Sequence, residues 1–259
     1  MKPFIKRMLE LLPMPKNYKV CTIISNFSGS NSYSLSKYAS DNNERTHLEI
    51  LETFNISKYW LISRILRCKV IVSTHGLVVK PRGGRYIELW HGFPMKALGL
   101  LDKSSPLNIK KAFQKNFMLA DKIISYSPFY TTLMNACIGV NLEKFVITGA
   151  PRNDFLLLSN GVENLRKLTG RSIGKSKIVF FLPTFRKGFL DRTEGVFLNG
   201  VFGIGEDLNE LNNFLEQNDI VLIFKPHPME ERFFKDFPKS DRIVFIRNSD
   251  LERNRIDLY

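Results

Sequence analysis

Short, uninterrupted runs of β-branched and aromatic residues recur along most of the chain, and segments of helical character lie between them. Unbroken apolar runs are typical of strands buried on both faces, as in a parallel sheet covered by helices. We therefore predict an α/β fold of the doubly wound type. The predicted strands are residues 20–25, 69–73, 86–90, 122–127, 144–149, 177–183, 220–226 and 242–246, and the predicted helices are 56–66, 106–119, 128–137 and 206–217.

The pattern is weakest in the polar, glycine-containing stretch SNGVENLRKLTGRSIGKSK. A chain of 259 residues is long enough for two domains. We expect a Rossmann-like domain over residues 1–158, a linker over 159–176 and a second Rossmann-like domain over 177–259. The second domain contains three convincing strands, whereas a Rossmann-type half usually has about five or six. We therefore expect the C-terminal domain to be truncated.

Charge and cysteine content limit the partners and the compartment. Lys and Arg number 38 against 25 Asp and Glu, which gives a net charge of +13 and favours anionic partners. The three cysteines lie far apart and lack metal-ligand spacing, so we expect a reducing cytoplasm and neither a disulfide framework nor a zinc module. No apolar run reaches about 18 residues, so we expect no membrane span.

Residues 1–16 combine apolar positions at helical spacing with lysine and arginine on other faces. A basic amphipathic helix of this kind can lie on an anionic membrane surface. The alternative is a first helix that packs on the protein core. The segment lacks the uninterrupted apolar core and the cleavage site of a signal peptide.

Four predicted strands end in segments that carry cations or histidines. In open α/β sheets, ligands bind beyond the carboxyl ends of the strands. Arg and Lys neutralise phosphate charge, and histidine can transfer a proton near neutral pH. His47 and His75 lie outside these segments, and we assign them no function. The pattern predicts a site for a phosphate-rich substrate, formed by four loops that carry His91 and Lys96, Arg152 and Asp154, Thr184 and Arg186, and Lys225 and His227.

Each of these residues also has a simpler interpretation. His91 can donate a hydrogen bond to a loop carbonyl. Arg152 and Asp154 can form a local ion pair in a turn. Arg186 can belong to a solvated run of charges. No cluster of Asp or Glu is typical of a magnesium site, so we expect neither an obligatory metal nor a cofactor.

The order of the strand-end motifs resembles one known family. The motifs are ELWHGFPMKALG, ITGAPRNDFL, FLPTFRKG and IFKPHP, and the earlier ISNFSGSNSYSLSKYA is similar to the family's first strand and turn. Over residues 20–250 the chain resembles the CDP-glycerol glycerophosphotransferase family of teichoic acid polymerases and primases. The resemblance implies a GT-B fold, with two Rossmann-like halves, in a peripheral protein at the cytoplasmic face of the bacterial membrane.

The resemblance also implies a reaction and roles for residues. A hydroxyl of a lipid-linked glycerol phosphate or polymer acceptor attacks CDP-glycerol, and CMP leaves. His91 matches the general base, and His227 matches the histidine held against the donor's phosphates. The family's further strand and loop that hold the donor nucleotide are not found before Tyr259, which again implies a truncated donor half. The substrate-binding positions in the matching motifs are Arg152, Asp154, Arg186, Lys96, Lys225 and Thr184.

Other function classes stay open at this point. The chain could be a non-catalytic module whose basic cleft binds anionic polymer or lipid. It could also be a GT-B glycosyltransferase that uses another nucleotide-activated donor. Nucleic-acid binding is supported only by net charge, because no RNP-like, helix-turn-helix or zinc-finger pattern is found, and we expect no nucleic-acid partner.

Overall fold

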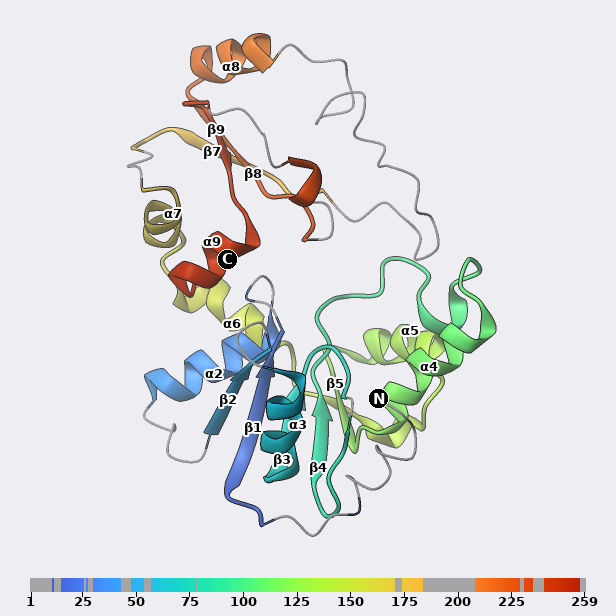
Figure 1. Ribbon diagram of the computed structural model, residues 1–259. Helices are drawn as coiled ribbons and strands as arrows, with labels where there is room; N and C mark the ends of the chain where they lie inside the picture. Colours follow the sequence, from blue (N-terminus) through green and yellow to red (C-terminus); the bar gives the residue numbers. More distant parts are fainter. Residues whose placement is uncertain are drawn as a thin grey trace. The chain divides into compact units, whose positions relative to one another are not determined.

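The computed structural model describes residues 11, 15–25, 27, 30–42, 48–53, 57–77, 79–170, 174–183, 208–228, 231–234 and 240–256. The chain forms two compact units and passes from the first to the second between Ser159 and Asn160. Each unit contains a sheet of parallel strands accompanied by helices (Figure 1). The predicted α/β fold with parallel strands is therefore confirmed.

The first unit is built on a six-stranded sheet with the strand order β2-β1-β3-β4-β5-β6, in which neighbouring strands pair in parallel. Strand β2 lies on one side of β1, and the later strands lie on the other. This reversal between β1 and β3 is the kind of position at which α/β proteins bind ligands, beyond the carboxyl ends of the strands. The strands are β1 (Tyr18–Ile24), β2 (Leu48–Glu52), β3 (Cys68–Ser73), β4 (Arg85–Glu88), β5 (Lys122–Ser125) and β6 (Phe145–Ile147).

Serine side chains fix where several helices of this unit begin. Ser30, Ser57 and Ser127 each accept a hydrogen bond from the backbone N–H three residues later, which satisfies a donor that has no acceptor within the helix. The helices are α2 (Asn31–Asp41), α3 (Lys58–Leu66), α4 (Leu107–Met118), α5 (Pro128–Ile138) and α6 (Pro151–Leu158), with 3-10 turns η2 (Gly99–Leu101) and η3 (Leu142–Lys144).

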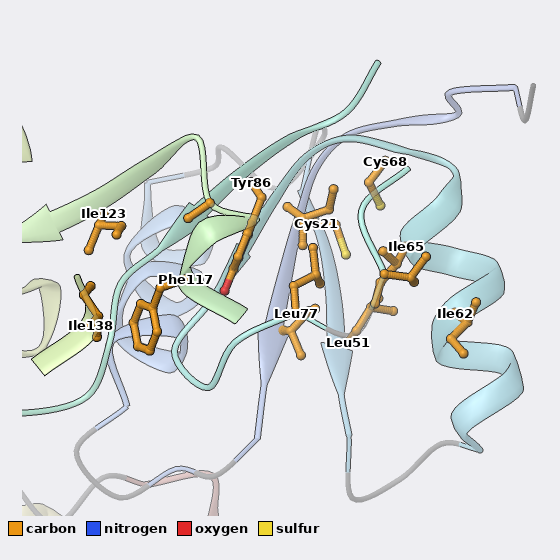
Figure 2. Close-up of a cluster of buried hydrophobic side chains, with 14 of the residues drawn as sticks. Cys21, Leu51, Ile62, Ile65, Cys68, Leu77, Tyr86, Phe117, Ile123 and Ile138 are labelled. Carbon is orange, nitrogen blue, oxygen red and sulfur yellow. The ribbon is translucent and has the colours of Figure 1, made fainter. Parts of the chain in front are cut away.

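A cluster of apolar side chains fills the interior of the first unit (Figure 2). Cys21, Ile71 and Tyr86 lie opposite one another on β1, β3 and β4, and all three are fully buried. Ile62 and Ile65 of α3 belong to the same cluster. Removal of this apolar surface from water is the main term that stabilises the sheet and its helices.

The three cysteines lie in the interior of the first unit. Cys21, Cys68 and Cys137 are buried free thiols. No helix in the described part of the chain has the length and apolar character needed to cross a bilayer.

The second unit contains a three-stranded parallel sheet with the order β7-β8-β9. Its core joins Leu215, Leu222, Phe224, Phe234 and Ile243. The central strand β8 is the most buried of the three. The elements are α7 (Gly161–Thr169), β7 (Lys177–Phe181), α8 (Leu208–Gln217), β8 (Ile220–Phe224), η5 (Glu231–Phe234), β9 (Ile243–Phe245) and α9 (Asn248–Asn254).

The segment predicted as a linker, residues 159–176, contains helix α7. The Asn160 side chain accepts a hydrogen bond from the backbone N–H of Glu163 and starts the helix, and Gly170 ends it in a left-handed conformation at φ +66°. The polar composition that indicated a linker belongs to a helix with a single buried residue, Leu165. The limits proposed for the two domains stay a prediction.

Other local expectations differ from the structure. Residues 150–154, expected as a loop, lead into α6, because Pro151 occupies the first helical position, where its fixed φ suits a helix. Strand β2 and helix α2 were not predicted. The expectation that all strands are buried on both faces is wrong for β7, in which Val179 and Phe180 are 44% and 46% exposed. The predicted N-terminal helix lies almost entirely outside the described residues.

Candidate functional site

The loops at the carboxyl ends of the strands in the first unit are joined by side-chain hydrogen bonds. The segments that follow β1, β3, β4, β5 and β6 all take part. They carry Asn31, His75, His91, Tyr126 and Arg152, in that order along the chain. The site therefore lies at the switch point of the sheet, where the strand order reverses.

Glu88, the last residue of β4, is fully buried and fastens two of these loops. Its Oε1 accepts the backbone N–H of Trp90 at 2.8 Å, and its Oε2 accepts the backbone N–H of Gly76 at 2.9 Å. The Tyr86 hydroxyl donates to the same Oε2. Burial raises the pKa of Glu88 to about 7, although these three hydrogen bonds act in the opposite direction.

Trp90 turns the chain away from the sheet. Its φ of +54° is in the left-handed region, which is costly for a residue with a large side chain. Two contacts hold it there: its N–H donates to Glu88, and its indole packs against Phe113 and Phe117. The predicted strand 86–90 ends at Glu88 for this reason, and the following residue, His91, is placed above the end of the sheet.

His91 is bonded in a way that fixes its tautomer. Its Nδ1 lies 2.8 Å from the backbone oxygen of Thr74. A carbonyl oxygen can only accept, so Nδ1 carries the proton and Nε2 carries a lone pair. Burial lowers the pKa of His91, the hydrogen bond to Thr74 raises it, and the positive charge of Arg152 lowers it further. The simpler interpretation of His91, a bond to a loop carbonyl, is thus correct, and it prepares Nε2 to accept a proton.

His75, for which no function was predicted, lies against His91. The two imidazole rings are parallel within 7°, and their centroids are 4.3 Å apart. The Nδ1 of His75 lies 2.8 Å from the Thr74 hydroxyl. His75 is exposed over part of its surface, but the desolvation of its ring and the neighbouring His91 lower its pKa to about 4, so it is neutral near pH 7. His75 follows strand β3, and the strand-end rule used for the other residues would have found it.

Asn31 is a second residue that the sequence did not single out. It is fully buried at the start of α2. Its Nδ2 lies 3.3 Å, 2.8 Å and 3.2 Å from the backbone oxygens of Leu89 and Trp90 and the hydroxyl of Tyr126. Its Oδ1 accepts the backbone N–H of Arg152 at 3.1 Å. One amide therefore connects four segments, and its only sequence signal is the turn before α2.

The remaining candidates of the first unit differ in position. Arg152, in the first turn of α6, donates from Nη1 to the backbone oxygen of His91 at 2.8 Å. Asp154 lies in the same turn and is exposed. Lys96 is also exposed and lies in the loop that follows His91. The structure thus brings Arg152 to His91 and leaves Asp154 and Lys96 on the surface.

The candidates of the second unit follow strands β7 and β8. Lys225, directly after β8, is 6% exposed, and its backbone N–H donates to the oxygen of Phe181 at 3.1 Å. Burial raises the pKa of Glu231, and the positive charge of Lys225 acts in the opposite direction and lowers it. His227, two residues further, is partly exposed. Thr184 and Arg186 lie outside the described residues.

A cavity of about 460 Å³ lies at the amino end of β4, away from the histidines. Its lining includes the turn 80–85. Asp121 binds this turn, because its carboxylate pairs with Lys80 at 2.6 Å and Arg85 at 3.5 Å and accepts the N–H of Tyr86 at 2.7 Å. We interpret this cluster as a structural connection between β4 and β5. Within the described ranges, no group of three or more His, Cys, Asp or Glu side chains could hold a metal ion, and the expected independence from metal stays a prediction.

The fold and this site define a parallel α/β protein with a neutral histidine at the switch point of its sheet. The chain belongs to the CDP-Glycerol:Poly(glycerophosphate) glycerophosphotransferase family, whose model matches residues 11–255. The resemblance found in the sequence motifs is therefore confirmed.

Two curated relatives support this membership. The chain is 27% identical over 206 residues to the teichoic acid poly(glycerol phosphate) polymerase of Bacillus spizizenii, a match that covers 75% of this chain and 50% of that protein. It is also 27% identical over 148 residues to the teichoic acid glycerol-phosphate transferase of Staphylococcus aureus, with 53% of this chain and 37% of that protein covered. The matches span half or less of the length of these relatives.

Solved structures share the fold. The wall teichoic acid polymerase TagF matches with a TM-score of 0.70 at 18% identity, covering 96% of this chain and 67% of that chain. A variant of TagF soaked with CDPG matches with a TM-score of 0.68 at 16% identity, covering 95% of this chain and 66% of that chain. Because both matches are below 25% identity, they show that this chain shares the α/β fold of the polymerase and nothing further.

Proposed function

We propose that this protein is a CDP-glycerol glycerophosphotransferase of teichoic acid or capsule synthesis. It transfers glycerol phosphate from CDP-glycerol to a hydroxyl of a lipid-linked glycerol phosphate or of a polymer acceptor. The proposal is supported by the family match and by the names of the relatives. The observation that carries it is the tautomer of His91, whose Nδ1 donates to Thr74 and whose Nε2 carries a lone pair.

In this reaction the acceptor hydroxyl loses its proton to Nε2 of His91. The hydroxyl oxygen forms a bond to the phosphorus next to the glycerol of the donor. The bond between that phosphorus and the oxygen that bridges to CMP breaks, and its electron pair leaves with CMP. A positioned base of this kind contributes about 10² to 10⁴ in rate. Because His91 is neutral near pH 7, it is in the form that can accept the proton.

Cations stabilise the charge that spreads over the phosphate oxygens in the transition state. Arg152 brings a permanent positive charge next to His91. We propose that Arg152 contacts the phosphate that is transferred. Asp154 and Lys96, on the surface of the same unit, are proposed as further contacts with the substrate. These assignments follow the strand-end positions of the residues and their match to the family's motifs.

We assign donor binding to the second unit. His227 and Lys225 follow the central strand β8, and Thr184 and Arg186 come from the segment after β7. In this proposal each unit is one Rossmann-like half of a GT-B enzyme, and His227 of the second unit contacts the donor's phosphates. The match to TagF supports the α/β fold on which this assignment is based. The truncation of the donor half stays a prediction.

We also propose that the protein works at the inner face of the cell membrane as a peripheral protein. Exposed apolar side chains and lysines alternate between residues 93 and 118. Apolar side chains can enter the interfacial region of a bilayer while lysines contact anionic headgroups. The apolar members are Phe93, Met95, Leu101, Leu107 and Met118, and the lysines are Lys103, Lys111 and Lys115.

A CMP-release assay tests the activity. The purified chain is mixed with CDP-glycerol and a lipid-linked glycerol phosphate, and we expect CMP to be released. His91→Ala should lower kcat by about 10² to 10⁴ with little change in donor affinity. The control is Tyr59→Phe, a change at an 86% exposed residue of α3, which should leave kcat unchanged.

Three results would contradict the proposal. Binding of CDP-glycerol without CMP release by the wild type would favour a binding module. Faster turnover of UDP-sugars than of CDP-glycerol would favour a glycosyltransferase. Equal rates for the wild type and His91→Ala would remove His91 from the reaction.

A further inference from the structure

We propose that His75 and Glu88 are positioning residues for His91: Glu88 fastens the two loops that carry the histidines, and the stacked ring of His75 holds the imidazole of His91 with Nε2 available as the base. The inference deepens the proposed function, since it concerns the same site. It rests on contacts between residues of the first unit.

The first step is the connection through Glu88. Its two carboxylate oxygens accept the N–H of Gly76 and the N–H of Trp90, which belong to the loops after β3 and β4. Gly76 has a φ of +79°, a conformation that suits glycine, so this N–H is presented to Glu88 at little cost. A carboxylate can accept all of these bonds because both of its oxygens are acceptors. The two loops are therefore held in one relative position.

The second step is the bond that this position allows. Thr74 lies in the first loop and His91 in the second, and the carbonyl of Thr74 accepts from Nδ1 of His91 at 2.8 Å. A histidine in water favours the other tautomer, with the proton on Nε2. The bond to Thr74 reverses this preference, because it stabilises the proton on Nδ1. The base form of His91 thus depends on the distance between the loops, which Glu88 fixes.

The third step is the stacked pair. At a centroid distance of 4.3 Å, the ring of His75 covers one face of His91 and excludes water from it. His75 is itself hydrogen-bonded to Thr74. When His91 accepts a proton, it faces a neutral ring whose π-electrons favour the new charge. Two charged rings at this distance would repel each other, so a neutral His75 is required.

The charged and titratable groups around the pair are few among the described residues. Arg152 contacts the backbone of His91, and its charge lowers the pKa of the ring. His91 likewise lowers the pKa of His75. Glu88, Tyr86 and the shared Thr74 complete the network. Arg152 thus favours the neutral form of His91 and His91 favours the neutral form of His75, whereas the hydrogen bond to Thr74 raises the pKa of His91.

Nitrogen NMR of the histidine side chains tests the role of Glu88 without requiring turnover. In the wild type, we expect His91 to carry its proton on Nδ1 at pH 7.5. In Glu88→Gln, the amide NH2 must face one of the two backbone N–H groups, so one loop loses its acceptor. We expect His91 to shift to the Nε2–H tautomer in this variant, with kcat for CMP release reduced about 10- to 100-fold and the KM for CDP-glycerol unchanged.

The matched control is Glu49→Gln. Glu49 is also a largely buried strand carboxylate, and it binds Arg64 away from the histidines. This change should lower stability and leave the tautomer of His91 as in the wild type. Tyr86→Phe removes one donor and keeps both loop bonds, so it should also preserve the tautomer. Two spectra would overturn the role of Glu88: a wild-type spectrum in which His91 carries its proton on Nε2, or a Glu88→Gln spectrum in which His91 still carries it on Nδ1.

Two variants test His75 even if Glu88→Gln fails to fold. His75→Phe keeps a planar ring over His91, and His75→Ala removes it. We expect the kcat of His75→Phe to stay within about threefold of the wild type. The kcat of His75→Ala should fall about 10- to 100-fold, and the KM for the donor should be unchanged in both variants. Equal kcat values for the two variants would overturn the stacking role. In one outcome the wild type releases no CMP while His91 still changes its tautomer in Glu88→Gln. That result would contradict the proposed reaction and support the positioning role of Glu88.

Discussion

The guanidinium of Arg152 donates a hydrogen bond from Nη1 to the backbone oxygen of His91 at 2.8 Å, across 61 residues of sequence. This contact joins the first turn of α6 to the turn that follows β4. It also places a permanent positive charge near the imidazole. Burial and this charge both lower the pKa of His91, so the ring is neutral at a lower pH than a histidine in water.

Removal of the charge should move the pH dependence of catalysis. In Arg152→Ala we expect the pKa of His91 to rise. Because the neutral ring is the base, activity increases with pH as His91 loses its proton, and the acid limb of the kcat profile should therefore shift to higher pH. Profiles between pH 5 and 8 measure the shift. Arg152→Lys keeps the charge and should retain most of the wild-type profile, whereas an Arg152→Ala profile that matches the wild type would contradict the argument.

Asn31 should be intolerant of a carboxylate. In Asn31→Asp an oxygen replaces the NH2 group that faces the carbonyl oxygens of Leu89 and Trp90. An uncompensated buried charge costs about 3 to 5 kcal/mol. The folded state raises the pKa of the new carboxyl, so the loss of stability should grow as the pH rises. Urea unfolding at several pH values measures it.

The control for this change is Asn42→Asp. Asn42 is exposed at the end of α2, where its side chain donates to the oxygen of Tyr38. A carboxylate there is solvated, and we expect a loss below about 1 kcal/mol. Equal losses at the two positions would show that the buried amide has no special role.

Glu88 should make stability depend on pH. Its pKa is about 7 in the folded protein against 4.5 for the free side chain. Between these values the folded state binds a proton that the unfolded state has lost, so the free energy of unfolding falls as the pH rises. The full effect is on the order of 3 kcal/mol.

Glu88→Gln isolates this contribution, because glutamine does not titrate. Relative to the wild type, the variant should gain stability as the pH rises from 4.5 to 7.5 in denaturant titrations. A constant difference between the two proteins over this range would mean that Glu88 has the same pKa in the folded and unfolded states.

Gly99 should not accept an alanine. It has a φ of +57°, and an added Cβ would lie 2.3 Å from the backbone oxygen of Cys137 and 2.6 Å from the ring of Phe113. We expect Gly99→Ala to lower stability by about 3 kcal/mol or more, through the clash and the backbone strain together. Thermal unfolding monitored by circular dichroism measures the change.

Gly149 provides the comparison, because its φ of +84° is also left-handed but nothing lies within 4 Å of an added Cβ. Gly149→Ala should therefore cost about 1 kcal/mol, the strain alone. A loss of stability in Gly149→Ala as large as that in Gly99→Ala would contradict the close approach of Gly99 to Cys137 and Phe113.

Several features followed from the sequence because they depend on local patterns. Unbroken apolar runs indicated parallel strands, and eight of the nine described strands were found in this way. The order of four strand-end motifs indicated the family, since such motifs keep their chemistry close together in the sequence. His91 and Arg152 were singled out by the same rule, and the structure brings them into contact.

Other features depend on contacts between distant residues. No function was predicted for His75, and Asn31 and Glu88 were not singled out, because nothing local distinguishes a buried polar side chain from an exposed one. Only the packing of the sheet places the loops after β3 and β4 side by side, so that one carboxylate fastens both and two rings stack. The chain's residue pattern therefore determined its fold class and family, whereas the tertiary structure decided which groups surround His91, since hydrogen bonds and burial between distant segments exist only after folding.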